Sequence, residues 1–137
     1  MIVIVDTGPL VALIDPDTTE HPWMRDQARA LPRPLLTSEP VLTEAAFLLT
    51  RDGFEADELF ALAEAGVIEI GIEFNQECSP LRSLMRKYRG VPMSLADATL
   101  VRLSELHREC IVLTLDADFR IYRRNRNQPI PLLMPEK

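Results

Sequence analysis

Two short apolar runs constrain this chain more than any other feature of its sequence. Ile2–Val5 and residues 111–115, Ile-Val-Leu-Thr-Leu, each have the length of a strand buried on both faces. Segments with helical periodicity lie between them and alternate with further short apolar runs. This alternation is typical of a parallel sheet covered by helices. The sequence therefore predicts an α/β fold of three layers, α/β/α, with a central, mainly parallel sheet.

The length and composition indicate one folded domain. A chain of 137 residues, 47% of them hydrophobic and 26% charged, has the size and apolar content of a single globular domain. No linker, repeat or low-complexity segment divides it. We therefore expect residues 1–137 to form a single domain.

The N-terminal run predicts a cytoplasmic protein without a membrane segment. Ile2–Val5 ends at Asp6, too soon to span a membrane, and it has no basic region or cleavage site of a signal peptide. Cys78 and Cys110 lack the spacing of metal ligands, so we expect them to be buried, free thiols.

Periodicity, prolines, glycines and capping residues predict the element boundaries. The predicted strands cover 2–5, 35–37, 67–74, 111–115 and, at a sheet edge, 129–134. The predicted helices cover a short segment from residue 7, then 21–31, 38–51, 55–65, 78–89, 94–107 and 117–124. Ser38 and Ser94 are the expected N-caps of their helices.

The large apolar residues are expected in the core or, for one group, at a dimer surface. Trp23 and Phe47 are expected in the core. Leu59, Phe60 and Leu62 form the apolar face of the fourth predicted helix. That face fits either the core or the surface of a dimer.

Two acidic residues follow the two constraining runs. Asp6 comes directly after Ile2–Val5, and Asp116 directly after residues 111–115. In open α/β sheets the ligand site lies outside the carboxyl ends of the strands. Asp6 and Asp116 are therefore predicted at such a site.

Two further acids stand on predicted helices without a basic partner. Glu44 shares helical spacing with Val41 and Phe47, which predicts a face directed toward the core. Asp97 has no Lys or Arg three or four positions away. A carboxylate in such surroundings needs a partner, and a bound cation would supply one.

The four acids together predict a metal site. Carboxylates that converge within a few ångströms repel one another, and a cation removes the repulsion. Oxygen ligands without a His or Cys cluster indicate Mg²⁺ or Mn²⁺. Hard divalent ions held by carboxylates commonly hydrolyse phosphodiesters, which predicts that reaction class.

The basic residues point to phosphate contacts rather than to a uniformly basic surface. The net charge of −6 argues against such a surface. Lys87 and Lys137 are the only lysines among 15 basic residues, and Arg is the better residue for bidentate phosphate contacts. A candidate group lies near the C-terminus: Arg120, Arg123, Arg124 and Arg126. It fits equally well with a solvated helix end.

These motifs resemble the PIN-domain ribonucleases, in particular the toxins of VapBC-type toxin–antitoxin pairs. The resemblance extends over essentially the whole chain. It is carried by Ile-Val-Asp6-Thr7, by Glu44 in the helix after the second strand, by Leu95-Ala96-Asp97-Ala98, and by Leu113-Thr114-Leu115-Asp116-Ala117-Asp118-Phe119.

The resemblance implies a role for each acid. Asp6 and Asp97 would ligate Mg²⁺ or Mn²⁺ most directly, with help from Asp116. Glu44 would orient or deprotonate the attacking water. All four would then be catalytic residues.

The same resemblance implies supporting residues. Thr7 and Thr114 would hold carboxylates in place through their hydroxyls. Asp118 competes with Asp116 for the role of fourth acid. We favour Asp116 because it directly follows the predicted strand, and we expect Asp118 to cap the next short helix or to support the site.

The family also implies a biological role. It predicts an endoribonuclease that cuts single-stranded or loop RNA, forms a homodimer and is blocked by a small antitoxin protein. The C-terminal arginine group would then contact RNA or the antitoxin.

Other classes of protein fit the sequence less well. A phosphatase of the haloacid-dehalogenase type needs a second Asp two residues after Asp6, where Gly8 stands. A phospho-receiver domain needs a Lys after its last central strand, and only Lys137 is available. The main alternative is a non-catalytic PIN-like module that binds RNA or a protein. The intact set of acids disfavours it.

Overall fold

The computed structural model describes residues 1–136, and Lys137 lies outside the described residues. The elements follow one another in this order: β1 (Ile2–Val5), α1 (Thr7–Ile14), α2 (His21–Ala30), β2 (Leu35–Thr37), α3 (Glu39–Arg51), α4 (Asp57–Glu64), β3 (Ile68–Ile70), α5 (Phe74–Lys87), α6 (Leu95–Leu106), β4 (Cys110–Leu113), the 3₁₀ helix η1 (Ala117–Arg120), β5 (Arg123–Arg124), β6 (Gln128–Pro129) and β7 (Leu132–Leu133).

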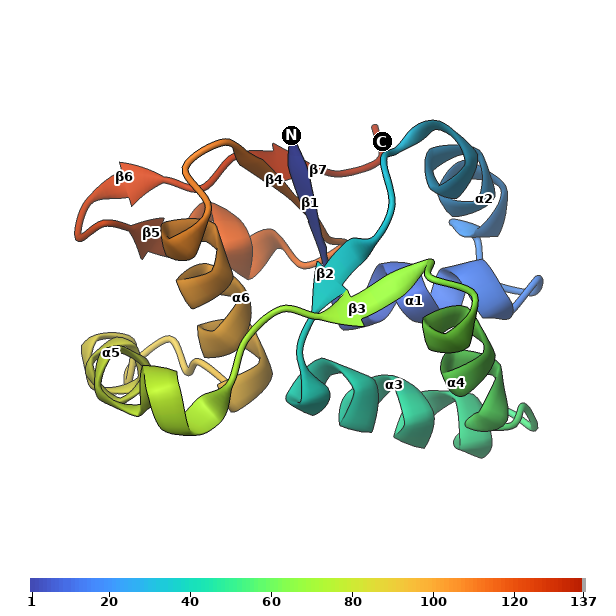
Figure 1. The fold of residues 1–137 in the computed structure, drawn as a ribbon, viewed down its shortest axis with the longest axis horizontal. Coiled ribbons are helices and arrows are strands. Elements are labelled where there is room, and N and C mark those ends of the chain that lie inside the picture. The colour runs from blue at the N-terminus through green and yellow to red at the C-terminus, as the bar shows by residue number, and fades with distance from the viewer. Residues whose placement is uncertain (137) are drawn as a thin grey trace.

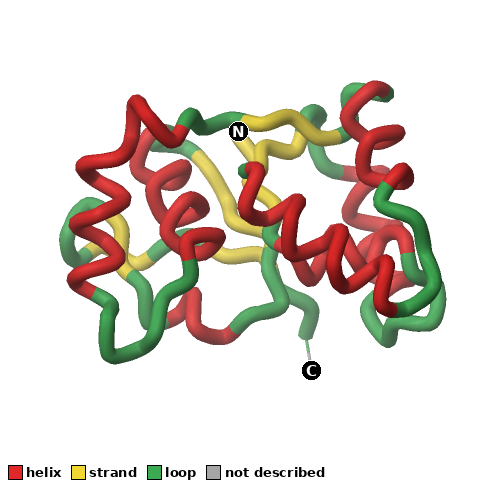
Figure 2. Tube along the Cα trace, turned by 90° about the horizontal axis from the view of Figure 1, so that it is seen from below, coloured by secondary structure: helices red, strands yellow, loops and turns green. Residues whose placement is uncertain are grey.

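The predicted α/β architecture is confirmed. Five strands form one sheet in the order β3-β2-β1-β4-β7, and every neighbouring pair is parallel. The sheet lies in the middle of the molecule with helices on either side (Figure 2). In Figure 1, α5 and α6 lie on one side, and α1, α2 and α4 on the other.

The strand order creates a switch point between β1 and β4. From β1 the chain proceeds to β2 on one side, whereas β4 pairs with the other side of β1. Val5 is in register with Leu113, so the residues that follow, Asp6 and Thr114, emerge next to each other. Ligands of open α/β sheets bind at such a point, outside the carboxyl ends of the strands.

The core and the capping residues explain why the strands and helices form here. Val3, Ile4 and Val5 are almost completely buried, as a strand covered on both faces requires. The Ser38 hydroxyl accepts a hydrogen bond from the backbone N–H of Val41 at 3.4 Å and caps α3. Gly53, after the end of α3, has φ of +90°, a conformation that favours glycine.

Two predicted strands are shorter than expected. The run 111–115 is a strand only as far as Leu113, so Asp116 does not directly follow it. The N–H of Thr114 still donates to the carbonyl of Leu133, at 3.2 Å, and beyond it the N–H of Asp116 turns back to donate to the Thr114 hydroxyl, at 3.0 Å. The expected strand over 67–74 is limited to Ile68–Ile70, and α5 begins at Phe74 instead of Cys78.

The C-terminal segment also differs from the prediction. The expected helix over 117–124 is only the short η1, and the expected edge strand over 129–134 is divided. Its first part, β6, pairs with β5 in an antiparallel hairpin, whereas β7 forms the edge of the main sheet. Pro131 separates the two parts; its carbonyl accepts a hydrogen bond from Val112.

Two aromatic side chains expected in the core are partly or mainly accessible. Phe47 is 68% exposed, because α3 turns Val41 and Ala45 inward instead. Trp23 is half-buried and packs against the edge of the core. Trp23 lies on α2 and Phe47 on α3, and in both helices the packing against neighbouring elements determines which face is buried.

The apolar residues of α4 and the two cysteines are divided between the core and the surface. In α4, Leu59 packs in the core and Phe60 remains exposed. Cys78 is exposed, which corrects its expected burial, whereas Cys110 is buried. Both thiols are free, as expected.

None of the helices in residues 1–136 has the length and apolar character needed to cross a membrane.

Candidate active site

The four predicted acids come together at the switch point. Asp6, Glu44, Asp97 and Asp116 line one pocket of about 250 Å³, with Thr7, Gly8 and Leu115. Asp6 directly follows β1, Asp116 lies between β4 and η1, Glu44 lies on α3, and Asp97 lies in the first turn of α6. Residues far apart in the sequence thus share one small acidic pocket.

Asp6 is the buried centre of this pocket. Its side chain is 6% exposed, and both oxygens accept hydrogen bonds. The backbone N–H of Thr7 donates to Oδ1 at 2.7 Å, and the hydroxyl of Thr114 donates to Oδ2 at 2.7 Å. Because Thr114 also accepts from the N–H of Asp116, one hydroxyl connects the ends of both strands.

The surroundings of Asp6 oppose its negative charge. Burial raises the pKa of this carboxyl to about 6, although the hydrogen bonds from Thr114 and Thr7 act in the opposite direction. The negative charges of Asp97 and Asp116 add to the increase. Within residues 1–136 no Lys, Arg or His forms an ion pair with any acid of the pocket. The site therefore favours a cation.

Glu44 is exposed, which corrects the predicted core-directed position. Val41, Ala45 and Leu49 form the buried face of α3, and Glu44 lies outside it. The hydroxyl of Thr7 donates to Oε2 of Glu44 at 3.0 Å and holds the carboxylate over the pocket. The two predicted supporting threonines thus contact different acids, Thr7 contacting Glu44 and Thr114 contacting Asp6.

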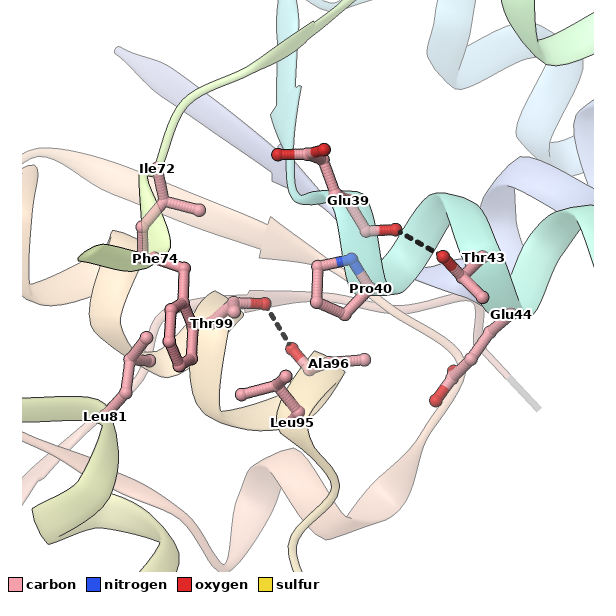
Figure 3. A pocket seen from close by; sticks show the side chains of 10 residues that line it. All are labelled: Glu39, Pro40, Thr43, Glu44, Ile72, Phe74, Leu81, Leu95, Ala96 and Thr99. Atoms are coloured by element: carbon pink, nitrogen blue, oxygen red, sulfur yellow. Dashed lines mark hydrogen bonds between the residues drawn. The ribbon is translucent and has the colours of Figure 1, made fainter. Parts of the chain in front are cut away.

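Glu44 also lines a larger, mostly apolar pocket, which Figure 3 shows from close by. This pocket of about 510 Å³ lies between α3, α5 and α6, and Phe74 and Leu95 contribute to its walls. Glu39 is the other charged residue among the described residues that line it. An apolar wall with acids and no cation does not suit a phosphate group. Glu44 lines both pockets, so this apolar pocket adjoins the acidic pocket at α3.

Asp97 is half-buried and held from two sides. It forms a capping box with Ser94: its backbone N–H donates to Ser94 Oγ at 3.0 Å, and its Oδ2 accepts from the N–H of Ser94 at 3.2 Å. The hydroxyl of Tyr122 donates to the same Oδ2 at 3.0 Å. Neither partner is basic, so the charge of Asp97 is oriented but not neutralised.

Tyr122 is a site residue that the sequence reasoning missed. Its side chain is fully buried, and burial together with the negative charge of Asp97 raises the pKa of its hydroxyl. The hydroxyl therefore stays protonated and remains a donor to Asp97. A buried Tyr hydroxyl usually needs a hydrogen-bond partner, but this general rule does not indicate that the partner is Asp97.

The structure distinguishes Asp116 from Asp118 by position. Asp116 is exposed and lines the pocket, whereas Asp118 is half-buried and is absent from the pocket lining. Oδ1 of Asp116 accepts from the N–H of Asp118 at 2.9 Å and caps η1. The expected capping role of Asp118 is therefore wrong, and Asp116 has that role.

The donor set suits a hydrated Mg²⁺ or Mn²⁺. Within residues 1–136 no group of three or more His, Cys, Asp or Glu side chains is arranged to hold a metal ion directly. Mg²⁺ keeps several water ligands and usually takes only one or two carboxylates from a protein. The pocket offers only oxygen donors, and each carboxylate keeps lone pairs beyond its hydrogen bonds, so it fits that ion by chemistry.

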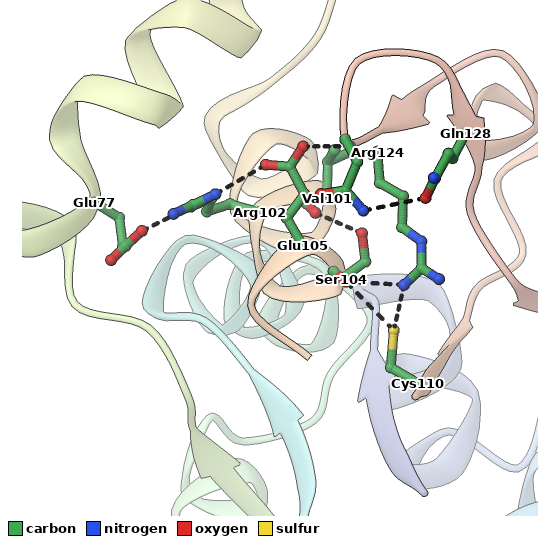
Figure 4. A network of polar contacts seen from close by, with 9 residues as sticks. Glu77, Val101, Arg102, Ser104, Glu105, Cys110, Arg124 and Gln128 are labelled. Carbon is green, nitrogen blue, oxygen red and sulfur yellow. Dashed lines mark hydrogen bonds and ion pairs between the residues drawn. The ribbon is translucent and has the colours of Figure 1, made fainter. Parts of the chain in front are cut away.

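The predicted arginine group does not act as one surface. The guanidinium of Arg124 donates from Nη1 to the carbonyl of Ser104 at 2.9 Å and to Sγ of Cys110 at 3.4 Å (Figure 4). Nη1 of Arg123 donates to the carbonyl of Arg120 at 2.7 Å. Arg120 and Arg126 are exposed. Arg124 thus holds the β5–β6 hairpin against the end of α6, and Arg120 and Arg126 face solvent.

A second set of contacts in Figure 4 fixes α6, which carries Asp97. Arg102 donates to Glu77 on α5 at 2.7 Å and to Glu105 at 3.2 Å. Glu105 in turn accepts from the backbone N–H of Asn125 in the hairpin at 2.7 Å. These partly buried ion pairs connect α5, α6 and the hairpin into one support.

Comparisons with known proteins agree with this geometry. A sequence profile of the PIN domain matches residues 3–125. The crystal structure of Mycobacterium tuberculosis VapC20, described as a sarcin-ricin loop cleaving toxin, superposes with a TM-score of 0.72 and 23% sequence identity, covering 85% of this chain and 91% of VapC20. No curated protein matches the sequence. The fold, the acids after β1 and β4, and the profile match over most of its length show that this chain belongs to the PIN domain family.

Proposed function

We propose that this PIN domain is a Mg²⁺- or Mn²⁺-dependent endoribonuclease. The observation that carries the proposal is the placement of Asp6, which is buried close enough to Asp97 and Asp116 to feel their charges and forms no ion pair within residues 1–136. Such an arrangement is costly for the protein alone and becomes favourable when a divalent cation binds. Membership in the PIN family and the VapC20-like fold support RNA as the substrate.

Each acid then has a distinct role. Asp6, Asp97 and Asp116 would hold the ion, in part through its water ligands, and Glu44 would orient or deprotonate the attacking water. The bound ion would stabilise negative charge on the phosphate and favour hydroxide near neutral pH. Thr7 holds Glu44, and Thr114 and Tyr122 orient the carboxylates that would face the ion.

The proposed biological role is that of a toxin in a type II toxin–antitoxin pair. VapC20, whose fold this chain shares, is described as a toxin. Phe47 and Phe60 are 68% and 66% exposed, which leaves apolar surface for a homodimer or for a small antitoxin. Analytical ultracentrifugation of the pure chain would test the homodimer.

Cleavage of a mixed RNA pool tests the enzymatic proposal. The wild-type protein should cut RNA with Mg²⁺ or Mn²⁺ and stop when EDTA is added. Asp6→Asn and Asp97→Asn should lose nearly all activity, whereas Asp26→Asn, an exposed residue of α2, should keep it. Equal cleavage by wild type and Asp6→Asn would contradict the proposal. No cleavage at high enzyme concentration would favour a non-catalytic module that binds RNA or protein.

A matched pair of variants assigns the fourth acid. Asp116→Asn removes a carboxylate that lines the pocket, and Asp118→Asn removes one that does not. We expect the first change to reduce cleavage much more than the second. The reverse order would assign the role to Asp118.

A further inference from the structure

Another pocket adjoins the acidic one and continues along the same edge of the sheet. This Trp23 pocket has a volume of about 810 Å³ and lies beyond the carboxyl ends of β4 and β7. Leu115 lines both pockets, and Ala117, next to Asp116, lines the Trp23 pocket. A Cβ on Gly8 would lie 3.0 Å from Cδ1 of Leu115, so glycine permits this side chain to form the shared wall.

One side chain that lines the Trp23 pocket is aromatic. Trp23, the only tryptophan of the chain, is half-buried on α2 and lines the pocket. The Nδ1 atom of His21 lies 2.7 Å from the carbonyl oxygen of Ala12, a hydrogen bond that ties the start of α2 to α1. Trp23 makes no cation–π contact with any residue in 1–136. The helix that carries Trp23 is therefore tied to α1, and the indole packs against the core with part of its surface accessible for stacking.

Another side chain that lines the Trp23 pocket is a cation. Arg120, at the end of η1, is exposed and lines the Trp23 pocket. Its guanidinium forms no ion pair within the described part of the chain. Glu20 and Glu136 also line the pocket, but neither forms an ion pair with Arg120. Because both glutamates repel anions, Arg120 is the side chain of this pocket that would receive a phosphate.

We infer that the Trp23 pocket binds one nucleotide of the RNA, next to the phosphodiester held at the acids, with its base on Trp23 and its phosphate on Arg120. The volume is that of a small-molecule site. Proteins commonly bind single-stranded RNA by stacking bases on aromatic side chains and pairing phosphates with Arg. The inference rests on the proposed ribonuclease function for the identity of the ligand.

Fluorescence of the single tryptophan tests this binding without catalysis. Adenosine monophosphate and a short single-stranded oligodeoxynucleotide are titrated into the protein in EDTA. Both should quench Trp23 in a saturable manner. Arg120→Ala should weaken binding about ten-fold, through loss of a charge-assisted contact. For the oligodeoxynucleotide it should also reduce the slope of log K against log salt by about 0.7.

Arg25→Ala is the matched control, because Arg25 is exposed on α2 but does not line the pocket. The affinity of Arg25→Ala for both probes, and its salt slope for the oligodeoxynucleotide, should equal those of the wild type. Absence of quenching by both probes would overturn the inference, as would equal affinities of Arg120→Ala and Arg25→Ala. Either result would do so even if the protein cuts RNA. Quenching that depends on Arg120 would support the pocket even if no RNA is cut, and the missing cleavage would then count against the proposed function alone.

Steady-state cleavage of RNA provides a second measurement. Trp23→Phe keeps an aromatic face and should retain KM, whereas Trp23→Ala should raise KM about ten-fold because a stacking partner is lost. Circular dichroism would show whether Trp23→Ala folds; if it does not, the exposed Arg120 variant decides the question. Equal KM values for folded Trp23→Ala and Trp23→Phe would overturn the role of Trp23 in stacking.

Discussion

Replacing Asp6 by asparagine should change the stability of the metal-free protein in a pH-dependent manner. The folded chain raises the pKa of Asp6 from 3.8 to about 6. Between these values the native state binds more protons than the unfolded state, so the free energy of unfolding of the wild type falls as pH rises. The asparagine of Asp6→Asn does not titrate, so the free energy of unfolding of this variant lacks this fall with rising pH.

The size of the effect follows from the pKa shift. A shift of about two pKa units corresponds to a loss of about 3 kcal/mol, most of it between pH 4 and pH 7. An asparagine can accept from only one of the two donors, Thr7 N–H or the Thr114 hydroxyl, which costs about 1 kcal/mol at every pH. The variant should therefore be about 1 kcal/mol less stable than wild type near pH 4 and about 2 kcal/mol more stable near pH 8.

Urea unfolding in EDTA, followed by circular dichroism at pH 4, 6 and 8, measures both proteins. Because the lost hydrogen bond costs the same at each pH, it cancels in the comparison between pH values. Thermal midpoints should show the same trend, with a relative change of about 10 °C for a domain of this size. Asp26→Asn, an exposed aspartate on α2, controls for the general change of charge. A stability difference that stays constant from pH 4 to pH 8 would refute the claim that burial and neighbouring carboxylates act on Asp6.

Four further outcomes are expected. Mn²⁺ at about 100 times its dissociation constant should stabilise the wild type by about 2.7 kcal/mol, and Asp97→Asn should reduce that gain; a melting curve unaffected by Mn²⁺ would leave the acids without a metal. Tyr122→Phe removes the hydroxyl donor to Asp97 and should weaken Mn²⁺ binding about ten-fold in calorimetry, whereas unchanged affinity would show that this contact is only structural. Thr114→Val removes a bond that lowers the pKa of Asp6, so the pH midpoint of Mn²⁺ binding should rise, and Thr114→Ser should restore it. Arg124→Ala should lower the free energy of unfolding by about 1–3 kcal/mol in urea titrations, because the Ser104 carbonyl loses a charged donor; no change would mean that the hairpin does not depend on it.

Part of the site could be predicted from local sequence alone. The short apolar runs predicted buried parallel strands, and the residue after β1, Asp6, had to lie at the carboxyl edge of the sheet. Ser94 at the start of α6 was also predictable as a cap, and its spacing from Asp97 is that of a capping box. These features depend on a few neighbouring residues, so local chemistry determines them.

The exposure of Glu44 could not be predicted in this manner. The apolar spacing of Val41 and Phe47 around it suggested a core-directed face, but α3 packs against both α1 and α6, and only this packing selects its buried side. Phe47 therefore lies at the surface, and Glu44 reaches the pocket from outside, held by Thr7.

By itself, the sequence determined the parallel α/β fold, the acid at the end of β1 and the caps of α3 and α6, because strand burial and capping are short-range properties. Only the tertiary structure decided that Tyr122 donates to Asp97, that Asp116 rather than Asp118 lines the pocket, and that Trp23 and Arg120 face a common cavity. Each of these facts joins residues from distant or irregular segments. Their positions depend on how helices, hairpin and sheet pack together, and no local pattern encodes that arrangement.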